Sequence, residues 1–422
     1  MRNVLVVGAG PAGLYAAHKL AQAGCSVAVF NRDIKPGGLA EYGIYPVKHK
    51  MKDGLRKQFH NFLAMPNVQY LGNVAVGGGG LPLDALREFH ADAVLFTVGA
   101  QGTRKLGLPG EESGRVYAAK DFVYHFNQLP PYATQPFPLG KRVAIVGMGN
   151  VMVDVARWIL QDDADKTTEE VVVVARRGPF EVKFDRHEFD AIHMHLNRSD
   201  FSDELRRVQE RLVAVGQDCA KVKETTFPWL ATPHETVTPK LGFRFLSTPQ
   251  EILRGADGNM AGLRVAENTL VPKGDDVAAK ATDATADLDC DTLIYAIGDV
   301  VDPALGLPMG KDAYATDPEH PYQAQKLPGW FVAGWARKPS EGLVGNARMD
   351  GEHCVAEVLK YLEHAPEVAS AVPPADLPAL LRARGFQVIT QAELAKLEAV
   401  EARRGEHFKF SDNASMLAAI NS

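Results

Sequence analysis

Two glycine-rich segments lie far apart in this chain, each between an apolar run typical of a strand and an amphipathic run typical of a helix. The first is Gly8-Ala9-Gly10-Pro11-Ala12-Gly13 and the second is Gly147-Met148-Gly149-Asn150-Val151-Met152. Small residues let such a turn approach a pyrophosphate closely, and the helix that follows offers its unpaired N–H groups and positive dipole to that anion. The chain is therefore predicted to bind two dinucleotides, which indicates a flavin that reacts with a nicotinamide.

Both segments open the same predicted architecture. Residues 3–7, 11–23 and 26–30 are expected to form a strand, a helix and a strand, the first βαβ unit of a doubly wound sheet. Predicted strands at residues 142–146 and 171–175 repeat that order around the second segment. The predicted fold class is α/β, with two doubly wound Rossmann-like dinucleotide-binding domains.

The second domain is predicted to be inserted into the first. Four prolines within residues 129–138 exclude a helix or a central strand and mark a crossing between domains, and an apolar segment at 330–335 is typical of a strand that returns to the first sheet. Between residues 242 and 289, short alternating runs in a polar context predict a surface hairpin or meander. We expect a discontinuous first domain of residues 1–105 and 330–364, a second domain of residues 106–329, and a small C-terminal extension of residues 365–422.

Composition restricts the class of protein further. A length of 422 residues and an apolar content of 46% are ordinary for a soluble protein of two domains. Four widely spaced cysteines without a CxxC pair predict neither a disulfide scaffold, a metal site nor a redox dithiol, which disfavours a dithiol reductase. The absence of a signal region and of a membrane-spanning stretch predicts a cytoplasmic location. A net charge of −6 argues against a nucleic-acid partner.

The residues that follow the second predicted strand of each domain differ in chemistry. In the first domain, Asn31 stands where an acidic residue usually binds the ribose hydroxyls, and its carboxamide can still accept a hydrogen bond without charge. In the second domain the position is taken by Arg176 and Arg177. Guanidinium groups bind a 2′-phosphate that a carboxylate would repel, so NADP is favoured over NAD. The alternative is a pair of solvated loop arginines.

Several motifs in the same order resemble one known family. They are Gly147-Met148-Gly149-Asn150-Val151 with Asp154-Val155-Ala156-Arg157, then Arg176-Arg177-Gly178-Pro179, and finally Gly334-Trp335 ahead of Gly342-Leu343-Val344. From Met1 to about Leu362, the chain resembles adrenodoxin reductase and its bacterial ferredoxin–NADP reductase relatives. The segment Gly37-Gly38-Leu39 with Tyr42-Gly43-Ile44 is also similar to the small subunit of glutamate synthase, without its cysteine-rich N-terminal segment.

The resemblance implies FAD in the first domain and NADP(H) in the second. For FAD it implies contacts from the first glycine segment, from three later loops and from the segment around Trp335, for which a core aromatic is the alternative. These residues are Gly8, Gly10, Pro11, Ala12, Gly13, Asn31, Gly38, Leu39, Val76, Gly99, Gly334, Trp335, Gly342, Leu343 and Val344.

For NADP the implied contacts lie at the pyrophosphate, at the 2′-phosphate and where nicotinamide meets flavin. These residues are Gly147, Met148, Gly149, Asn150, Val151, Arg176, Arg177, Glu188 and Gly342. Asp154 matches a carboxylate toward the nicotinamide end and is the one candidate catalytic residue, although a helix residue that bonds local backbone groups is the alternative. Lys48 stands where the family has a histidine, which leaves a proton relay there in doubt, and Ser340-Glu341 replaces the family's Pro-Thr.

The implied activity is transfer of hydride from NADPH to FAD, followed by transfer of single electrons to a ferredoxin-type iron–sulfur protein. Because ferredoxins are typically acidic, two basic segments are candidate docking surfaces. One is the run from Lys48 to Lys57 and the other comprises Arg206, Arg207 and Arg211, with a solvated lysine-rich face as the alternative. Two alternative functions remain. One is a flavin monooxygenase, and the other is an NADPH-oxidising subunit of a larger complex, like the glutamate synthase small subunit.

Overall fold

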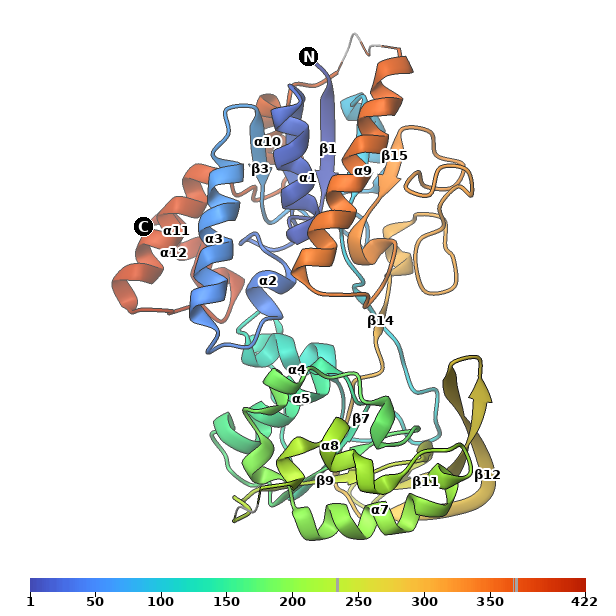
Figure 1. Ribbon diagram of the computed structural model, residues 1–422. Helices are drawn as coiled ribbons and strands as arrows, with labels where there is room; N and C mark the ends of the chain where they lie inside the picture. The colour runs from blue at the N-terminus through green and yellow to red at the C-terminus, as the bar shows by residue number, and fades with distance from the viewer. Residues whose placement is uncertain (233–234, 367, 369–370) are drawn as a thin grey trace. The chain divides into compact units, whose positions relative to one another are not determined.

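The computed structural model describes residues 1–232, 235–366, 368 and 371–422. The chain forms two compact units, which are coloured by residue number in Figure 1. Unit 1 comprises Met1–Arg104, Tyr124–Thr134 and Gly298–Ser422, and unit 2 comprises Lys105–Val123 and Gln135–Ile297. Each unit contains a five-stranded sheet of parallel strands, as the predicted α/β class requires.

Unit 1 is built on a sheet in the order β15-β4-β1-β2-β3. Its strands are β1 (Asn3–Val7), β2 (Ser26–Phe30), β3 (Val68–Leu71), β4 (Ala93–Phe96) and β15 (Trp330–Val332), and every pair is parallel. Alternate residues of β1 enter different core clusters, since Val4 and Val6 belong to one and Leu5 and Val7 to the other. Both faces of this sheet are therefore covered, which explains why its strands are continuous apolar runs.

Three long helices cover one face of this sheet, with α1 (Pro11–Gln22) between α3 (His49–Leu63) and α9 (Val344–His364) (Figure 1). Helices α1 and α9 approach closely, because a Cβ atom at Gly351 would lie 2.4 Å from the carbonyl oxygen of Ala12. The short helix α2 (Leu39–Tyr42) lies between β2 and α3 in sequence. Strands β5 (Gly102–Thr103) and β14 (Asp299–Val300) form a separate two-stranded antiparallel ladder.

The C-terminal segment is an integral part of unit 1, so the prediction of a small appendage is wrong. Its helices are α10 (Leu377–Ala383), α11 (Gln391–Arg404) and α12 (Asn413–Asn421), and all three supply buried side chains to the two core clusters. Ile389 and Gly72 exchange backbone hydrogen bonds of 2.8 and 2.9 Å, which extends the sheet beyond β3. This single bridge lies directly after β3, the edge strand of the sheet, and fastens the C-terminal segment there.

Two further boundaries differ from the predicted ones. Residues 298–329 belong to unit 1, because Leu305, Leu307 and Tyr314 are buried in the cluster that also contains Phe30. Residues 124–134 also belong to unit 1, where Leu129 and Tyr124 pack against Tyr42. The proline-rich segment was expected to mark the crossing into the second domain, but part of it is used for packing in the first.

Unit 2 is built on a parallel sheet in the order β6-β13-β7-β8-β9. Its strands are β6 (Val116–Ala118), β7 (Arg142–Val146), β8 (Glu170–Val174), β9 (Lys240–Arg244) and β13 (Thr292–Tyr295). The helices are α4 (Ala119–Phe126), whose last residues belong to unit 1, α5 (Asn150–Arg157), α6 (Arg186–Phe189), α7 (Arg198–Val213) and α8 (Val222–Thr225). No helix among the described residues is both long and apolar enough to cross a bilayer.

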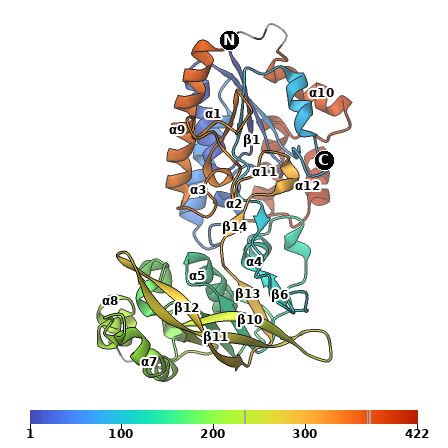
Figure 2. The same ribbon diagram turned by 90° about the vertical axis from the view of Figure 1, so that its right-hand side faces the viewer.

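A second, antiparallel sheet of unit 2 is a meander of three consecutive strands, one of the two forms that the sequence predicted for this segment. Figure 2 shows its strands β10 (Ser247–Arg254), β11 (Met260–Lys273) and β12 (Asp276–Leu288) side by side. Leu263 and Val265 are fully buried in a cluster with Val146 and Leu293 of the parallel sheet. The predicted surface position therefore holds for most of β12, whereas β11 buries alternate side chains against the parallel sheet.

Candidate functional site

The first glycine segment joins β1 to α1 and leaves one of its three fingerprint glycines facing open space. A Cβ atom at Gly8, whose φ is +113°, would lie 2.6 Å from the carbonyl oxygen of Thr97, and one at Gly13 would lie 2.0 Å from that of Gly8. These two glycines are required by the packing of the protein itself. A Cβ atom at Gly10 would meet nothing within 4 Å. The open space beside Gly10 fits the predicted pyrophosphate, and the contact of this loop with FAD stays a prediction.

Other predicted loops of unit 1 meet this segment at the carboxyl ends of the parallel strands. A Cβ atom at Gly38 would lie 3.1 Å from the Cα atom of Gly10, and one at Gly334 would lie 2.8 Å from the Cβ atom of Ala12. Gly99, with a φ of +73°, follows β4 at the same edge of the sheet. Ligands of open α/β sheets bind outside this edge, so the structure brings these predicted residues together where a dinucleotide would lie.

Asn31 holds the loop after β2. Its side chain is 6% exposed, its Oδ1 accepts a hydrogen bond of 3.2 Å from the N–H of Ala9, and its Nδ2 donates to the carbonyl oxygens of Asp33 and Lys35 at 2.8 and 2.9 Å. The carboxamide donates two bonds that a carboxylate could not donate. Asn31 therefore has a positioning role in this chain, and its contact with the ribose stays a prediction.

The segment around Trp335 is anchored by a carboxylate that sequence reasoning missed. Asp350 of α9 accepts a hydrogen bond of 2.6 Å from the N–H of Gly334 and pairs with Arg337. The indole N–H of Trp335 donates to the carbonyl oxygen of Glu341 at 3.0 Å, and the side chain is only partly buried, which excludes the core-aromatic alternative. Asp350 lies on α9 without a motif around it, so only the folded backbone brings it to Gly334.

The remaining predicted flavin residues are placed as follows. Leu343 is 71% exposed directly before α9, which begins at Val344. Its apolar side chain is therefore open to contact with a flavin ring, as the prediction requires. Leu39 begins α2 and packs against the cluster of Tyr42. Val76 follows β3 and packs, partly buried, on the second core cluster. Gly342, predicted to contact both cofactors, belongs to unit 1, and its role toward the nicotinamide stays a prediction.

The second glycine segment repeats this geometry between β7 and α5 of unit 2. A Cβ atom at Gly147, whose φ is +121°, would lie 2.3 Å from the carbonyl oxygen of Ala296, whereas one at Gly149 would meet nothing within 4 Å. Val151 is 44% exposed on the first turn of α5, while Met152 is fully buried beneath it. This segment also fits a pyrophosphate, because the open position is again the middle glycine.

The arginine loop after β8 folds back onto this segment. The N–H of Lys183 donates to the carbonyl oxygen of Met148 at 3.0 Å, and the N–H of Asp185 donates to Oδ1 of Asn150 at 2.7 Å. Just before Lys183, the nine-tenths buried Glu181 accepts a hydrogen bond of 2.8 Å from the N–H of Gly178 and shapes the turn after the arginines. The fold thus joins the predicted pyrophosphate and 2′-phosphate residues in one loop system.

The arginines themselves differ in environment. Arg176 is exposed, whereas the guanidinium of Arg177 lies 3.1 Å from Oδ2 of Asp276 on the hairpin of β11 and β12. Glu188 lies partly buried on α6, and Asp154 lies partly buried one turn along α5 from Asn150. Neither placement assigns a chemical role to these two carboxylates, so both roles stay predictions.

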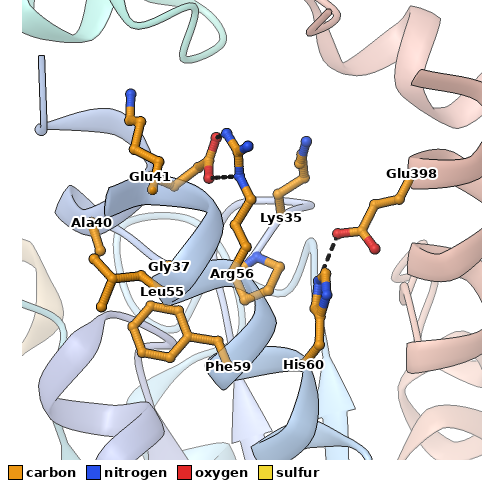
Figure 3. A pocket seen from close by; sticks show the side chains of 11 residues that line it. Lys35, Gly37, Ala40, Glu41, Leu55, Arg56, Phe59, His60 and Glu398 are labelled. Atoms are coloured by element: carbon orange, nitrogen blue, oxygen red, sulfur yellow. Dashed lines mark hydrogen bonds and ion pairs between the residues drawn. The ribbon is translucent and has the colours of Figure 1, made fainter. Parts of the chain in front are cut away.

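A narrow pocket of unit 1 is lined by Lys35, Glu41 and Arg56 among others (Figure 3), and these three side chains belong to a network of charges that extends to Lys409 and Glu401. Arg56 of α3 donates two hydrogen bonds of 2.7 Å to the carboxylate of Glu41, which also lies 2.7 Å from Nζ of Lys409. Nζ of Lys35 lies 2.5 Å from Oε2 of Glu401. The pocket encloses about 20 Å³, which is room for a water molecule and not for a nucleotide.

The charges of this network shift one another's protonation. Burial alone would raise the pKa of Glu41, but the hydrogen bonds from Arg56 and the charge of Lys409 outweigh it and lower the pKa to about 2. Burial lowers the pKa of Lys409, and the neighbouring Lys35 and Arg56 add to that effect against the opposing charge of Glu41. Glu41 therefore carries a full negative charge at neutral pH between its two cations.

Both predicted basic docking surfaces are smaller than their sequences suggest. Lys52 is 3% exposed and donates to Oδ1 of Asn127 at 2.7 Å, and Arg56 is paired with Glu41. Of the lysines and arginines in the run from Lys48 to Lys57, Lys50 and Lys57 are exposed on α3, where Asp53 is exposed as well. In unit 2, both Arg207 and Arg211 pair with Glu267, Arg207 also pairs with Glu204, and Arg206 pairs with Asp203, which largely neutralises the second surface.

Three comparisons with known proteins agree with this geometry. Residues 2–201 match the family described as pyridine nucleotide-disulphide oxidoreductase. The chain is 29% identical to NADPH:adrenodoxin oxidoreductase, mitochondrial, of Salvelinus fontinalis and 28% identical to NADPH-ferredoxin reductase FprA of Mycobacterium tuberculosis, over 96% of its own length and 87% and 94% of theirs. The structure of Mycobacterium tuberculosis FprA in complex with NADPH matches with a TM-score of 0.85 and 27% identity over the whole of both chains.

The resemblance predicted from the motifs is therefore confirmed, and the chain is a homologue of these reductases along nearly its whole length. The predicted fold class is confirmed by the same structural match. The word disulphide in the name of the matching family does not extend to this chain's own cysteines. All four are unpaired, and the three buried ones, Cys25, Cys290 and Cys354, have pKa values that burial raises.

Proposed function

We propose that this protein is an FAD-dependent oxidoreductase that takes hydride from NADPH and passes single electrons to a ferredoxin-type iron–sulfur protein. The observation that carries the proposal is the pair of fingerprint loops, each with a middle glycine that faces open space. The names of the homologous reductases, which specify NADPH together with adrenodoxin or ferredoxin, support the same activity.

FAD, when bound, supplies the step between the two-electron chemistry of a nicotinamide and a one-electron carrier. The protein's own residues bind and position the two cofactors. The loop around Gly10 and the start of α1 receive one pyrophosphate, Asp350 and Trp335 fix the segment that leads to Leu343, and the loop around Gly149 receives the other. No side chain is required as a nucleophile, because positioning accounts for the reaction.

Reduction of a purified ferredoxin by the holoenzyme tests this function. With NADPH under anaerobic conditions, the iron–sulfur absorbance of the ferredoxin should bleach at a rate proportional to enzyme concentration. Ferricyanide reduction in parallel separates loss of the NADPH half-reaction from loss of carrier recognition. An enzyme that oxidises NADPH with ferricyanide and reduces no iron–sulfur carrier would contradict the proposed acceptor.

The arginine pair provides a test of coenzyme choice. The double substitution Arg176→Ala with Arg177→Ala should raise KM for NADPH by about 100-fold, since each charge-assisted hydrogen bond to a phosphate contributes about 1.5–3 kcal/mol. KM for NADH, which has no 2′-phosphate, should change by less than about twofold by the same reasoning. Steady-state ferricyanide reduction with both coenzymes measures the two values. An equal loss with NADPH and NADH would mean that the pair does not bind the 2′-phosphate.

We further propose that the carrier is acidic and docks on a surface formed by Val47, which precedes α3, and by Lys50, Met51 and Lys57 of α3. Val47 and Met51 are 49% and 56% exposed, so the surface combines apolar area with two exposed cations. Such a surface steers an anionic partner and loses affinity as salt rises. A cytoplasmic location, where reduced unpaired cysteines are ordinary, is part of this proposal.

Reversing the charge of the two exposed lysines tests this surface and leaves the buried Lys52 unchanged. The variant Lys50→Glu with Lys57→Glu should raise KM for a ferredoxin by about five- to tenfold at low salt and leave ferricyanide reduction unchanged. A matched control reverses Lys223 and Lys280, two exposed lysines of unit 2, and so changes the net charge equally. Equal effects of the two double variants would show that only net charge matters and would remove this surface.

A further inference from the structure

An acidic residue of unit 2 already contacts one arginine of the predicted 2′-phosphate site. Oδ2 of Asp276 lies 3.1 Å from Nη1 of Arg177, and its other oxygen, Oδ1, accepts a hydrogen bond of 2.8 Å from the N–H of Val277. The side chain of Arg177 is 20% exposed and that of Asp276 is 63% exposed. The contact is therefore open to solvent on the side of the carboxylate, where a soluble anion can compete.

The position of Asp276 is set by a short turn. Asp276 is the first residue of β12 and pairs with Lys273 at the end of β11, so only Gly274 and Asp275 connect the strands. Gly274 has a φ of +61°, which a two-residue hairpin turn requires. The carboxylate thus belongs to a defined hairpin end.

The same sheet also holds the backbone of the arginine loop. Asn268 of β11 is fully buried, and its Nδ2 donates to the carbonyl oxygen of Arg176 at 2.8 Å. The N–H of Leu246 donates to the carbonyl oxygen of Arg177 at 3.2 Å, and the N–H of Asn268 donates to that of Leu246 at 2.8 Å. The arginine loop and β11, the strand that leads to the hairpin end, are therefore linked by hydrogen bonds at Arg176 and Arg177.

A carboxylate and a 2′-phosphate are both acceptors for the same guanidinium group. The Val277 N–H bond, with the charge of Arg177 acting in the same direction, lowers the pKa of Asp276, so the carboxylate is ionised at neutral pH. A dianionic phosphate that approaches Arg177 must displace this carboxylate or lie beside its negative charge. A nucleotide without the phosphate meets neither obstacle.

We propose that Asp276 is an internal competitor for the 2′-phosphate at Arg177, and that the hairpin of β11 and β12 thereby limits the preference of this enzyme for NADPH over NADH. This inference rests on the proposed use of NADPH. It assigns a specificity-determining role to a segment that lies about 100 residues along the chain from the arginine pair.

Binding of nucleotide fragments to the holoenzyme tests the role of Asp276 directly. By calorimetry at low salt, Asp276→Asn should bind 2′,5′-ADP about three- to tenfold more tightly than the wild type does, because an exposed ion pair and a neighbouring negative charge are both removed. Binding of 5′-AMP should be unchanged. The advantage of the variant should shrink as salt screens the carboxylate.

Two further variants separate the possible outcomes. Asp275→Asn removes the same charge from the adjacent position of the turn and should leave 2′,5′-ADP affinity at the wild-type value. Arg177→Ala should weaken 2′,5′-ADP binding and abolish the effect of Asp276→Asn in the double variant. Unchanged or weaker 2′,5′-ADP binding by Asp276→Asn, or an equal gain from Asp275→Asn, would overturn this inference alone. Failure of the wild type to prefer 2′,5′-ADP over 5′-AMP would instead contradict the proposed coenzyme.

Discussion

A Gly10→Val variant should fold normally and purify without FAD. The backbone at Gly10 has φ −79° and ψ −179°, which any residue adopts, and a Cβ atom there meets no protein atom within 4 Å. The apoprotein therefore tolerates the side chain, whereas the pyrophosphate loses the space that it needs against the start of α1. Flavin absorbance per protein should fall to background, with an unchanged far-ultraviolet circular dichroism spectrum.

Gly8→Ala is the matched control for this loop. At φ +113° an alanine is strained, and its Cβ atom would lie 2.6 Å from the carbonyl oxygen of Thr97, so this variant should lose the fold as well as the flavin. The contrast separates ligand space from turn packing. Stoichiometric FAD in purified Gly10→Val would show that the open position is not the pyrophosphate site.

The second large effect is expected at Glu41. The substitution Glu41→Gln removes the carboxylate between Arg56 and Lys409 and leaves their charges uncompensated in a site where the side chain of Glu41 is 3% exposed. Loss of one partner from a buried ion pair costs about 3–5 kcal/mol, and we expect unit 1 to be destabilised by that amount. Denaturant unfolding monitored by release of flavin measures the change in the unit that contains the network.

The stability difference between wild type and Glu41→Gln should depend on pH. The pKa of Glu41 is about 2 in the folded protein, below its usual value of 4.5, so the contribution of its charge is complete above pH 4.5 and is lost as pH falls toward 2. Glu398→Gln is the matched control, because Glu398 pairs with His60 at 29% exposure and should contribute less than about 1 kcal/mol. Equal destabilisation by the two variants would contradict the claim that the buried ion pairs of Glu41 contribute more stability than the exposed pair of Glu398.

The glycine segments, their flanking strands and the arginine pair were predictable because each is local in sequence. A strand, a turn and a helix within about 30 residues specify where a phosphate binds before any long-range contact is known. The order of motifs then sufficed for the fold class. The Cβ positions of Gly10 and Gly149 add what sequence alone could not supply, namely that the middle glycine of each loop faces open space.

The C-terminal segment was misjudged because its contacts are non-local. Lys35 and Glu401 are separated by 366 residues and meet only in the folded chain. The sequence of residues 391–404 therefore predicts a charged amphipathic segment on the surface. In the structure, Leu394, Leu397 and Glu401 of this helix are buried within unit 1. A composition-based boundary cannot detect a charged side chain whose partner lies at the other end of the chain.

The basic run on α3 did carry a usable signal. Lys52 lies seven residues before Phe59 and eleven before Leu63, so it falls on the apolar stripe of the helix, and all three side chains are buried. The number of charges in the run predicts an exposed face, whereas the helical spacing of Lys52 from Phe59 and Leu63 predicts that Lys52 is buried. In contrast, nothing in the sequence near Arg177 points to Asp276, because the hairpin that carries it is defined by strand register.

Anaerobic titration of the purified holoenzyme with NADPH tests the account most directly. One equivalent of NADPH should bleach the yellow flavin band rapidly, and NADH at the same concentration should bleach it much more slowly, since only NADPH presents a 2′-phosphate to Arg176 and Arg177. A flavin band that excess NADPH leaves unchanged, or protein that cannot be loaded with FAD, would contradict it.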